Sequence, residues 1–285
     1  MVITLDCIAC LVNSFTRLLK DGTFPQELKE PAMRRLLAFL ARTDYDRSPP
    51  ELGREMYRVI REMLHSDDPY REIKEKYNRL LLDLYPQLAQ RVAGAADPFD
   101  MAMRLAIAGN VIDFAPQADP DIKAAIERVI RARLAIDDSA MLRRDLERSR
   151  RLLYVGDNCG EIVLDRLFLE TIKHPDAVYA VRGEPVINDI TLHDARAVDM
   201  SSYARVITTG DDAPGAVWET ASEEFREELL RADVVLAKGQ GNLEGLIDVE
   251  HNIYFLLMVK CDTIAGRLGV RSNDFVVQRS PAVAG

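Results

Sequence analysis

Residues 152–161 have the sequence LLYVGDNCGE, in which four apolar residues run directly into a polar turn. More short apolar runs follow along the chain, and helical stretches around 160–173 and 218–231 lie between several of them. Short apolar strands that alternate with helices are typical of a doubly wound, mostly parallel sheet. In such sheets ligands bind beyond the carboxyl ends of the strands. The further runs are residues 177–181, 205–208, 233–237 and 254–259.

The first 150 residues show a different pattern, with helical periodicity and almost no strand signal. Apolar residues recur every three or four positions, and Ser48, Asp68, Asp97 and Asp119 each precede a proline in a helix-start pattern. We expect six or seven helices in an irregular bundle. The chain is therefore predicted to be an α+α/β protein, with a helical domain over residues 1–150 that can cap the active site and an α/β catalytic domain over residues 151–285.

The composition of the chain argues against several classes of protein. The 285 residues carry 37 Lys and Arg against 46 Asp and Glu, and the net charge of −9 argues against a nucleic-acid or anionic-membrane partner. No apolar run approaches the roughly 20 residues of a membrane helix, and the N-terminal stretch lacks the basic start of a signal peptide. Four cysteines are too few for a disulfide scaffold. We expect a cytoplasmic protein; the oligomeric state does not follow from the sequence.

Polar side chains follow the first two predicted strands of the α/β half. Asp157 and Asn158 come directly after the first strand, and Asp189 lies in the loop after the second. Carboxylate and amide oxygens suit a hard divalent metal, and we expect Mg²⁺, Mn²⁺, Co²⁺ or Ni²⁺. The alternative is that these residues only form turns and cap the following helices. A dinucleotide fold would carry GxGxxG after its first strand, so no nucleotide cofactor is expected.

Candidate phosphate-binding groups follow the same set of strands. Arg182 ends the second strand and can bind a phosphoryl oxygen bidentately, or pair with a surface acid. Thr208 and Gly210 can offer a hydroxyl and a backbone N–H group, or form an ordinary turn. Lys238 begins the block KGQGNLE, which also contains Asn242; it places a cation beside exposed backbone donors, or forms a flexible turn. Because all these loops fall at one sheet edge, they predict a site for a metal-bound phosphoester.

Three blocks make a resemblance specific. GDNCGE (156–161), RGEPVINDIT (182–191) and KGQGNLE (238–244) resemble, in this order, the signature blocks of the metal-dependent damage-control phosphatase family. The resemblance covers nearly the whole chain, and Cys7-x-x-Cys10 is similar to the archaeal and bacterial branch. It implies that Asp157, Asn158 and Asp189 hold a divalent metal, that Lys238 binds phosphate, and that the substrates are phosphate esters of small metabolites, often damaged or surplus sugar phosphates.

This resemblance predicts metal-assisted hydrolysis of a phosphomonoester. The nucleophile is a water or a carboxylate, with Asp157 the first candidate; Glu161 is a candidate general base, or only stabilises the helix N-terminus. Lys238 and Arg182 would stabilise charge on the phosphoryl group. Two rival functions stay open: a non-catalytic binding protein for an acidic metabolite or nucleotide, and a carboxyl methyltransferase, an activity described for one eukaryotic relative. The lack of a glycine-rich adenosylmethionine loop counts against the methyltransferase.

Some further residues allow two interpretations each. Asn110 and Asp113 share one face of an apolar helix, where they either face the crevice and bind substrate or form a buried pair. Cys7 and Cys10 form a CxxC that can bind zinc or cycle as a redox pair, but packing in a helical core is the favoured explanation. A four-sulfur site would also need Cys159 and Cys261. A surface role is favoured for His193 over that of a proton carrier.

Overall fold

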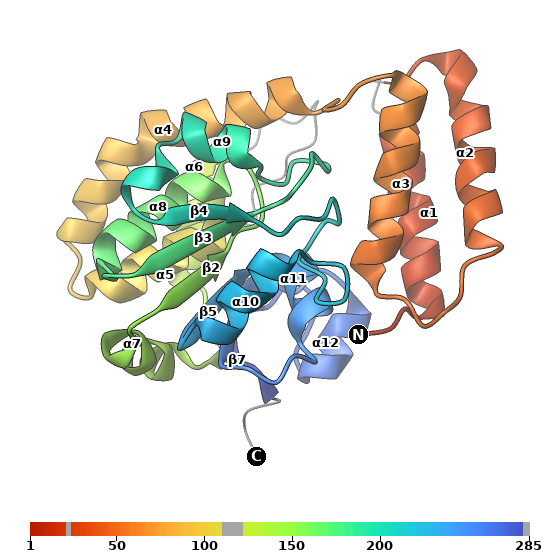
Figure 1. Cartoon of the computed structure of the whole chain (residues 1–285). Coiled ribbons are helices and arrows are strands. Elements are labelled where there is room, and N and C mark those ends of the chain that lie inside the picture. Colours follow the sequence, from red (N-terminus) through yellow and green to blue (C-terminus); the bar gives the residue numbers. More distant parts are fainter. Residues whose placement is uncertain (21–23, 110–121, 282–285) are drawn as a thin grey trace.

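The computed structural model describes residues 1–20, 24–109 and 122–281, which form helices around one seven-stranded sheet (Figure 1). The strand order is β1-β7-β6-β5-β2-β3-β4, and every neighbouring pair is parallel except β6 and β7. The carboxyl ends of β2 to β6 therefore share one edge, whereas β1 and β7 run in the opposite direction. The strands are β1 (Leu134–Asp137), β2 (Leu152–Val155), β3 (Ala177–Val181), β4 (Arg205–Thr208), β5 (Val234–Lys238), β6 (Ile253–Met258) and β7 (Phe275–Arg279).

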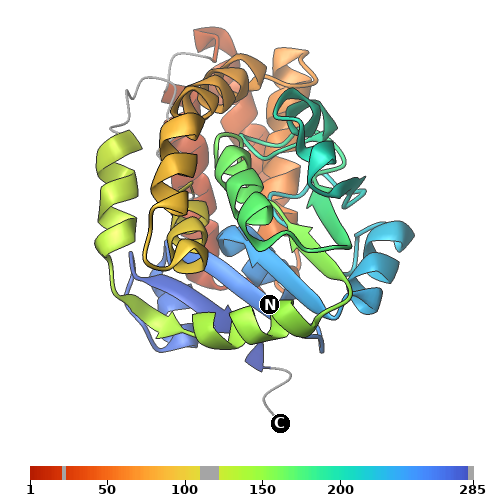
Figure 2. The ribbon, with the colours of Figure 1, turned by 90° about the vertical axis from the view of Figure 1, so that its left-hand side faces the viewer.

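Helices cover both faces of the sheet because successive side chains of a strand point to opposite faces. Leu152 and Tyr154 pack into one core, whereas Leu153 and Val155 pack into another. Figure 2 shows α4 and α8 next to each other on the first side. This side includes α4 (Arg71–Ala93), α5 (Pro98–Gly109), α6 (Ile122–Arg131) and α8 (Glu161–Ile172); the other includes α10 (Glu223–Arg231), α11 (Gly239–Leu246) and α12 (Asp262–Leu268).

Two helices and a 3₁₀ turn lie in the connections between strands. Helix α7 (Ser139–Arg148) runs between β1 and β2, and its Leu142 and Leu146 pack into the core on the α8 side of the sheet. Helix α9 (Leu192–Ala197) and a 3₁₀ turn (Met200–Ser202) connect β3 to β4. No helix among the described residues is both long and apolar enough to cross a membrane.

The first three helices form a separate packing unit beside the carboxyl edge of the sheet (Figure 1). We call α1 (Leu5–Lys20), α2 (Gln26–Leu40) and α3 (Pro49–Leu64) the three-helix unit. Its core contains Phe15, Leu36 and Ile60. The start of α3 follows the predicted pattern, since Pro49 is the first helical residue and Ser48 and Glu51 form a capping box.

The predicted architecture is confirmed, with two additions. The five predicted strands are β2 to β6, and the described residues before position 150 contain seven helices. Strands β1 and β7 were missed. Strand β1 lies before residue 150, so the sheet begins inside the half expected to be helical; β1 is only four residues long and just two of its four side chains are exposed. Such a short strand at a sheet edge gives little periodic signal. The division at residue 150 stays a prediction.

Candidate active site

The loops after β2 and β3 are joined by an antiparallel β-bridge between Asn158 and Asp189. The backbone N–H of Cys159 donates to Asn188 O at 2.8 Å, and that of Ile190 donates to Asp157 O at 3.0 Å. These bonds bring Asp157, Asn158 and Asp189 to one point at the carboxyl edge, with all three side chains buried. The expected convergence of these three residues is therefore present.

Arg182 joins the two carboxylates. Its Nε donates to Asp189 Oδ2 at 2.6 Å, and its Nη2 donates to Asp157 Oδ1 at 3.1 Å. The guanidinium is fully buried, so the alternative that Arg182 pairs with a surface acid is wrong. Its Nη1 is buried without a hydrogen-bond partner among the described residues. Buried donors are normally satisfied, so this group has donor capacity available for a ligand.

The cluster carries more acid than Arg182 balances. Burial, together with the neighbouring Asp189 and Glu161 carboxylates, raises the pKa of Asp157 to about 7. Burial also raises the pKa of Asp189, although Arg182 opposes this. A cation close to such carboxylates favours their charged form. The electrostatics of this site therefore favour binding of a positive ion.

The donor atoms fit a hard divalent cation. Within the described part of the chain, Asn158 Oδ1 and Asp189 Oδ1 accept no hydrogen bond. Two carboxylates and an amide oxygen are the donor types that Mg²⁺ and Mn²⁺ prefer, and such ions usually keep several waters. Among the described residues no three His, Cys, Asp or Glu side chains form a metal cage. Asp157, Asn158 and Asp189 can therefore form a site in which few ligands of the metal come from the protein.

Lys238 does not lie on a flexible turn, as one alternative proposed; its side chain is fully buried. Nζ donates to Glu161 Oε1 at 2.5 Å, Asp165 Oδ1 at 2.8 Å and Ala106 O at 2.7 Å. An ammonium group has three N–H donors, and all three are used inside the protein. Lys238 therefore has no N–H donor left for the direct contact with phosphate that we expected.

The carboxylates around Lys238 belong to a buried network that reaches the candidate metal ligands. Tyr154 and Tyr179 donate to the two oxygens of Asp165 at 2.6 and 2.7 Å. Glu161 Oε2 accepts a hydrogen bond from Asn158 Nδ2 at 3.2 Å. Lys238 therefore acts on Asn158 through Glu161, and its charge compensates two buried carboxylates.

Lys260 is a cation that the sequence reasoning missed. It comes two residues after β6, with an exposed side chain, and its backbone N–H donates to Gln240 Oε1 at 2.8 Å. Its positive charge is one of the influences that lower the pKa of Asp157 and of Asp189, which places it within electrostatic range of their cluster. The available signal was its position, because the apolar run 254–259 ends directly before it.

Three other predicted substrate ligands occupy structural positions. Asn242 is buried; its Oδ1 accepts from Ala216 N at 2.7 Å, and its Nδ2 donates to the carbonyls of Gly156 and Lys238. Gly210 has φ +74°, and a Cβ there would lie 2.5 Å from the Cβ of Ser222. Thr208 is the last residue of β4 and is half-buried. Asn110 and Asp113 lie outside the described residues.

The cysteines are all free thiols. Cys10 is exposed and Cys7 half-buried, so the core-packing explanation is wrong for Cys10. Cys159 is buried with Sγ 3.8 Å from Asp189 O, and burial raises the pKa of its thiol. No four-sulfur site forms among the residues described. His193 is exposed near Glu75, which agrees with the surface role favoured from the sequence.

Comparison with known proteins identifies the family of this chain. Residues 3–276 match the family model of the damage-control phosphatase ARMT1-like domain. This chain belongs to that family. It is 31% identical to a damage-control phosphatase of Pyrococcus horikoshii, over 98% of this chain and 99% of the relative, and 31% identical to one of Archaeoglobus fulgidus, over 95% and 97%.

Two more similarities support membership of the damage-control phosphatase family. An uncharacterized protein of Methanocaldococcus jannaschii is 37% identical over 80% of this chain and 79% of the relative. The crystal structure of a DUF89 family protein from Pyrococcus horikoshii superposes with a TM-score of 0.88 at 31% identity, covering 98% of this chain and 99% of that one. The recognised family and its α+α/β fold are therefore both confirmed.

Proposed function

We propose that this member of the damage-control phosphatase family is a divalent-metal-dependent phosphatase that hydrolyses phosphomonoesters of small metabolites, such as damaged or surplus sugar phosphates. The observation that carries the proposal is the meeting of Asp157, Asn158 and Asp189 across the β-bridge, beside Arg182 and Lys260. Oxygen donors for a cation next to side-chain cations for an anion are what a metal-assisted phosphoester reaction requires.

Asp157, Asn158 and Asp189 would hold Mg²⁺, Mn²⁺, Co²⁺ or Ni²⁺. When bound, such an ion neutralises phosphoryl oxygens and orients the reacting groups. The fit rests on the excess of buried negative charge around Asp157 and on the two side-chain oxygens, of Asn158 and Asp189, that accept no hydrogen bond in the described structure.

The remaining roles are assigned to this chain's own cations and acids. Lys260, exposed and within electrostatic range of the carboxylates, binds the phosphoryl group, and Arg182 Nη1 supplies a second donor. Lys238 keeps Glu161 in place, and Glu161 in turn holds the Asn158 amide. Asp157 remains the first candidate for a carboxylate nucleophile, with water as the alternative; Glu161 remains the candidate base.

An activity panel tests this proposal. Purified protein is assayed on p-nitrophenyl phosphate and on sugar phosphates with each of the four metals, and again with EDTA. We expect hydrolysis that EDTA abolishes and that Asp157→Ala reduces to background, whereas the exposed-site control Asp46→Ala retains it. Activity that persists with EDTA and in Asp157→Ala would contradict metal dependence. Saturable binding of a phosphorylated ligand without turnover would instead favour the binding protein.

A further inference from the structure

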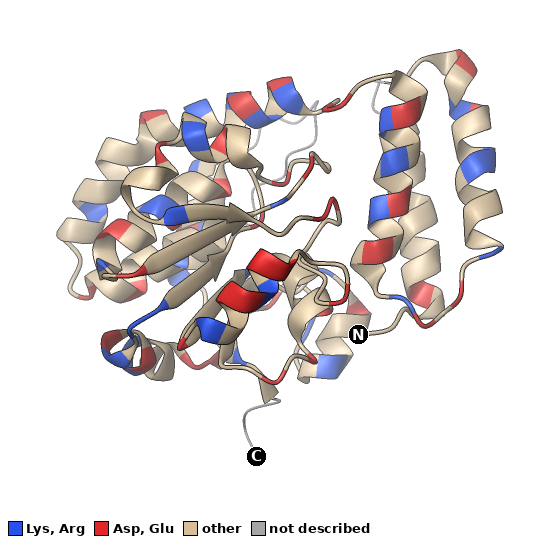
Figure 3. Ribbon diagram, in the orientation of Figure 1, with Lys and Arg blue, Asp and Glu red and all other residues tan. Residues whose placement is uncertain are grey.

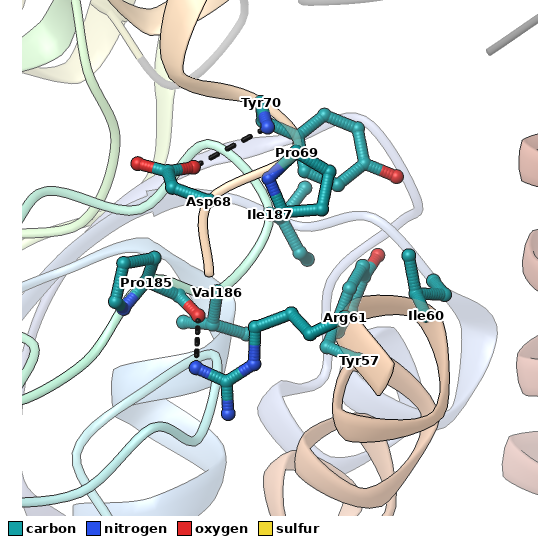
Figure 4. Close-up of a pocket in the computed structure, with 9 residues that line it drawn as sticks. All are labelled: Tyr57, Ile60, Arg61, Asp68, Pro69, Tyr70, Pro185, Val186 and Ile187. Atoms are coloured by element: carbon teal, nitrogen blue, oxygen red, sulfur yellow. Dashed lines mark hydrogen bonds between the residues drawn. The ribbon is translucent and has the colours of Figure 1, made fainter. Parts of the chain in front are cut away.

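The loop after β3, which carries Asp189, is packed into the three-helix unit. Val186 is 2% exposed and belongs to the core of that unit, and Ile187 packs against it. Both residues line a pocket together with Tyr57 and Ile60 of α3 (Figure 4). The cavity there has a volume of only about 10 Å³. A space of that size holds no more than one water, so the loop and α3 are in close contact.

Arg61 adds a polar attachment to this loop. Its Nη1 donates to Pro185 O at 3.0 Å (Figure 4), and its Nη2 pairs with Asp212 Oδ2 at 2.5 Å. One guanidinium of α3 therefore binds the loop after β3 and the loop after β4 together. The planar guanidinium of an arginine can donate to two acceptors in fixed directions, whereas the ammonium of a lysine sits on a flexible chain and orients its partners less rigidly.

The backbone between these contacts and Asp189 is strained. Ile187 has φ +42°, a left-handed conformation that is strongly disfavoured for a β-branched residue. The turn is closed by Asp189 N, which donates to Val186 O at 3.0 Å. Such strain persists only where the surroundings hold the chain in place, and it is typical of functional sites. Here the surroundings are α3 and the core of the three-helix unit.

Other ion pairs hold the three-helix unit against the same edge of the sheet. Arg54 Nη1 donates to both oxygens of Asp211, at 3.1 and 2.9 Å, and Arg58 binds both oxygens of Asp212, at 3.0 and 2.8 Å. Figure 3 shows the basic bands of α3 facing acidic loop tips. The unit is therefore fixed to the loops of the site by side chains of α3.

We propose that the three-helix unit positions Asp189 for metal binding, with Arg61 and Ile187 as the positioning residues. This inference rests on the proposed function, because it takes Asp189 as a metal ligand. Without the hydrogen bonds of Arg61, or without the Ile187 side chain packed against the core of the unit, the strained turn can relax. Asp189 then no longer faces Asp157 at a fixed separation, and the metal binds more weakly.

The test measures Mn²⁺ binding by titration calorimetry, together with hydrolysis of p-nitrophenyl phosphate at increasing Mn²⁺. Substitution of residues that orient metal ligands typically costs about 10–100-fold in metal affinity. We expect a loss of about 10-fold for Arg61→Ala and for Ile187→Gly, with kcat recovering at saturating Mn²⁺. Glycine adopts a positive φ without steric cost, so Ile187→Gly tests the loss of restraint while the backbone conformation stays accessible.

Controls separate positioning from folding and from the proposed function. Arg34→Ala, an exposed arginine of α2 in the same unit, should bind Mn²⁺ like the wild type, and circular dichroism verifies that each variant is folded. Folded Arg61→Ala and Ile187→Gly proteins with wild-type Mn²⁺ affinity would overturn the positioning role alone. A wild-type protein that binds no Mn²⁺ would overturn both the positioning role and metal dependence.

Discussion

Asn158 and Asp189 face each other across an isolated antiparallel β-bridge. Beside the bridge, the Sγ atom of Cys159 contacts the carbonyl of Asp189, which lies 30 positions further along the chain. The bridge links loops that follow two neighbouring parallel strands, β2 and β3. Main-chain hydrogen bonds thus tie together the two loops that carry the candidate metal ligands, and within the described residues Asn158 Oδ1 and Asp189 Oδ1 accept no hydrogen bond. A rigid pair of loops of this kind preorganises a site before any ligand binds.

The ammonium of Lys238 is predicted to stabilise the fold and not to bind phosphate. Lys238→Met keeps most of the side-chain volume but leaves Glu161 and Asp165 buried without their cation. Removal of one partner of a buried ion pair typically costs about 3–5 kcal/mol of unfolding free energy. Urea denaturation should show this loss, and a second substitution, Asp165→Asn, should recover part of it. A Lys238→Met protein of wild-type stability with a raised KM would contradict this role.

Lys260 is predicted to show the opposite behaviour. Its side chain is exposed, so Lys260→Ala should leave the urea midpoint unchanged. Loss of a charged hydrogen bond to phosphate, worth about 1.5–3 kcal/mol, corresponds to about 10–100-fold in kcat/KM. The inhibition constant for inorganic phosphate should rise in parallel. The exposed lysine of α6 gives a matched control, Lys123→Ala, for which neither constant should change.

Asn78 of α4 is predicted to hold the turn that carries Asp157 and Asn158. Its Oδ1 accepts a hydrogen bond from Gly160 N at 2.6 Å, in a buried position. Asn78→Ala leaves that N–H unsatisfied, which typically costs about 1–3 kcal/mol. We expect a lower urea midpoint together with a weaker Mn²⁺ affinity. The neighbouring exposed residue supplies the control, Arg79→Ala, and equal effects of both substitutions would exclude a specific role for Asn78.

Glu244 is predicted to make the protein less stable as the pH rises. Burial raises its pKa to about 7 from an ordinary value of 4.5, although Gln240 donates a hydrogen bond to it. Between these two values the folded state holds a proton that the unfolded state has lost, so unfolding free energy falls with increasing pH, and the penalty is complete above pH 7. Glu244→Gln carries no such proton.

The variant Glu244→Gln should therefore gain about 1–3 kcal/mol over the wild type at pH 8 and nothing at pH 4.5. Urea denaturation at both pH values measures the difference. The exposed Glu250→Gln should follow the wild type at each pH. A constant offset between wild type and Glu244→Gln across this range would mean that Glu244 does not titrate differently on folding.

The sequence alone determined five of the seven strands and most of the helices among the described residues. Runs such as 152–155 and 177–181 are apolar at every position because both faces of a parallel sheet are covered, and this pattern is local. The start of α3 is also local, since Ser48 and Glu51 satisfy each other's backbone donors. The polar residues directly after the strands located the candidate site for the same reason: parallel strands end at one edge.

Only the tertiary structure decided which lysine faces the site. Lys238 and Lys260 both follow apolar runs, but Lys238 is still part of β5, on the same face as Leu236, beneath α5 and α8. Lys260 lies beyond the end of β6, and none of the described helices buries its side chain. The sequence shows only that each lysine comes at or after the end of an apolar run. Whether that lysine is buried depends on the layer packed over it.

The helical contributions to the site were likewise decided by packing. Arg61 and Asn78 lie on ordinary amphipathic helices, and nothing in their local sequence connects them to loops more than 80 residues away. Their contacts with Pro185 and Gly160 exist because α3 packs beside α11 at the carboxyl edge of the sheet and α4 packs against α8. A helix or strand forms in response to its neighbours in the chain, so local sequence patterns predict it. The site is built from α3, α4 and the loops after β2 and β3, so it depends on how these elements pack together.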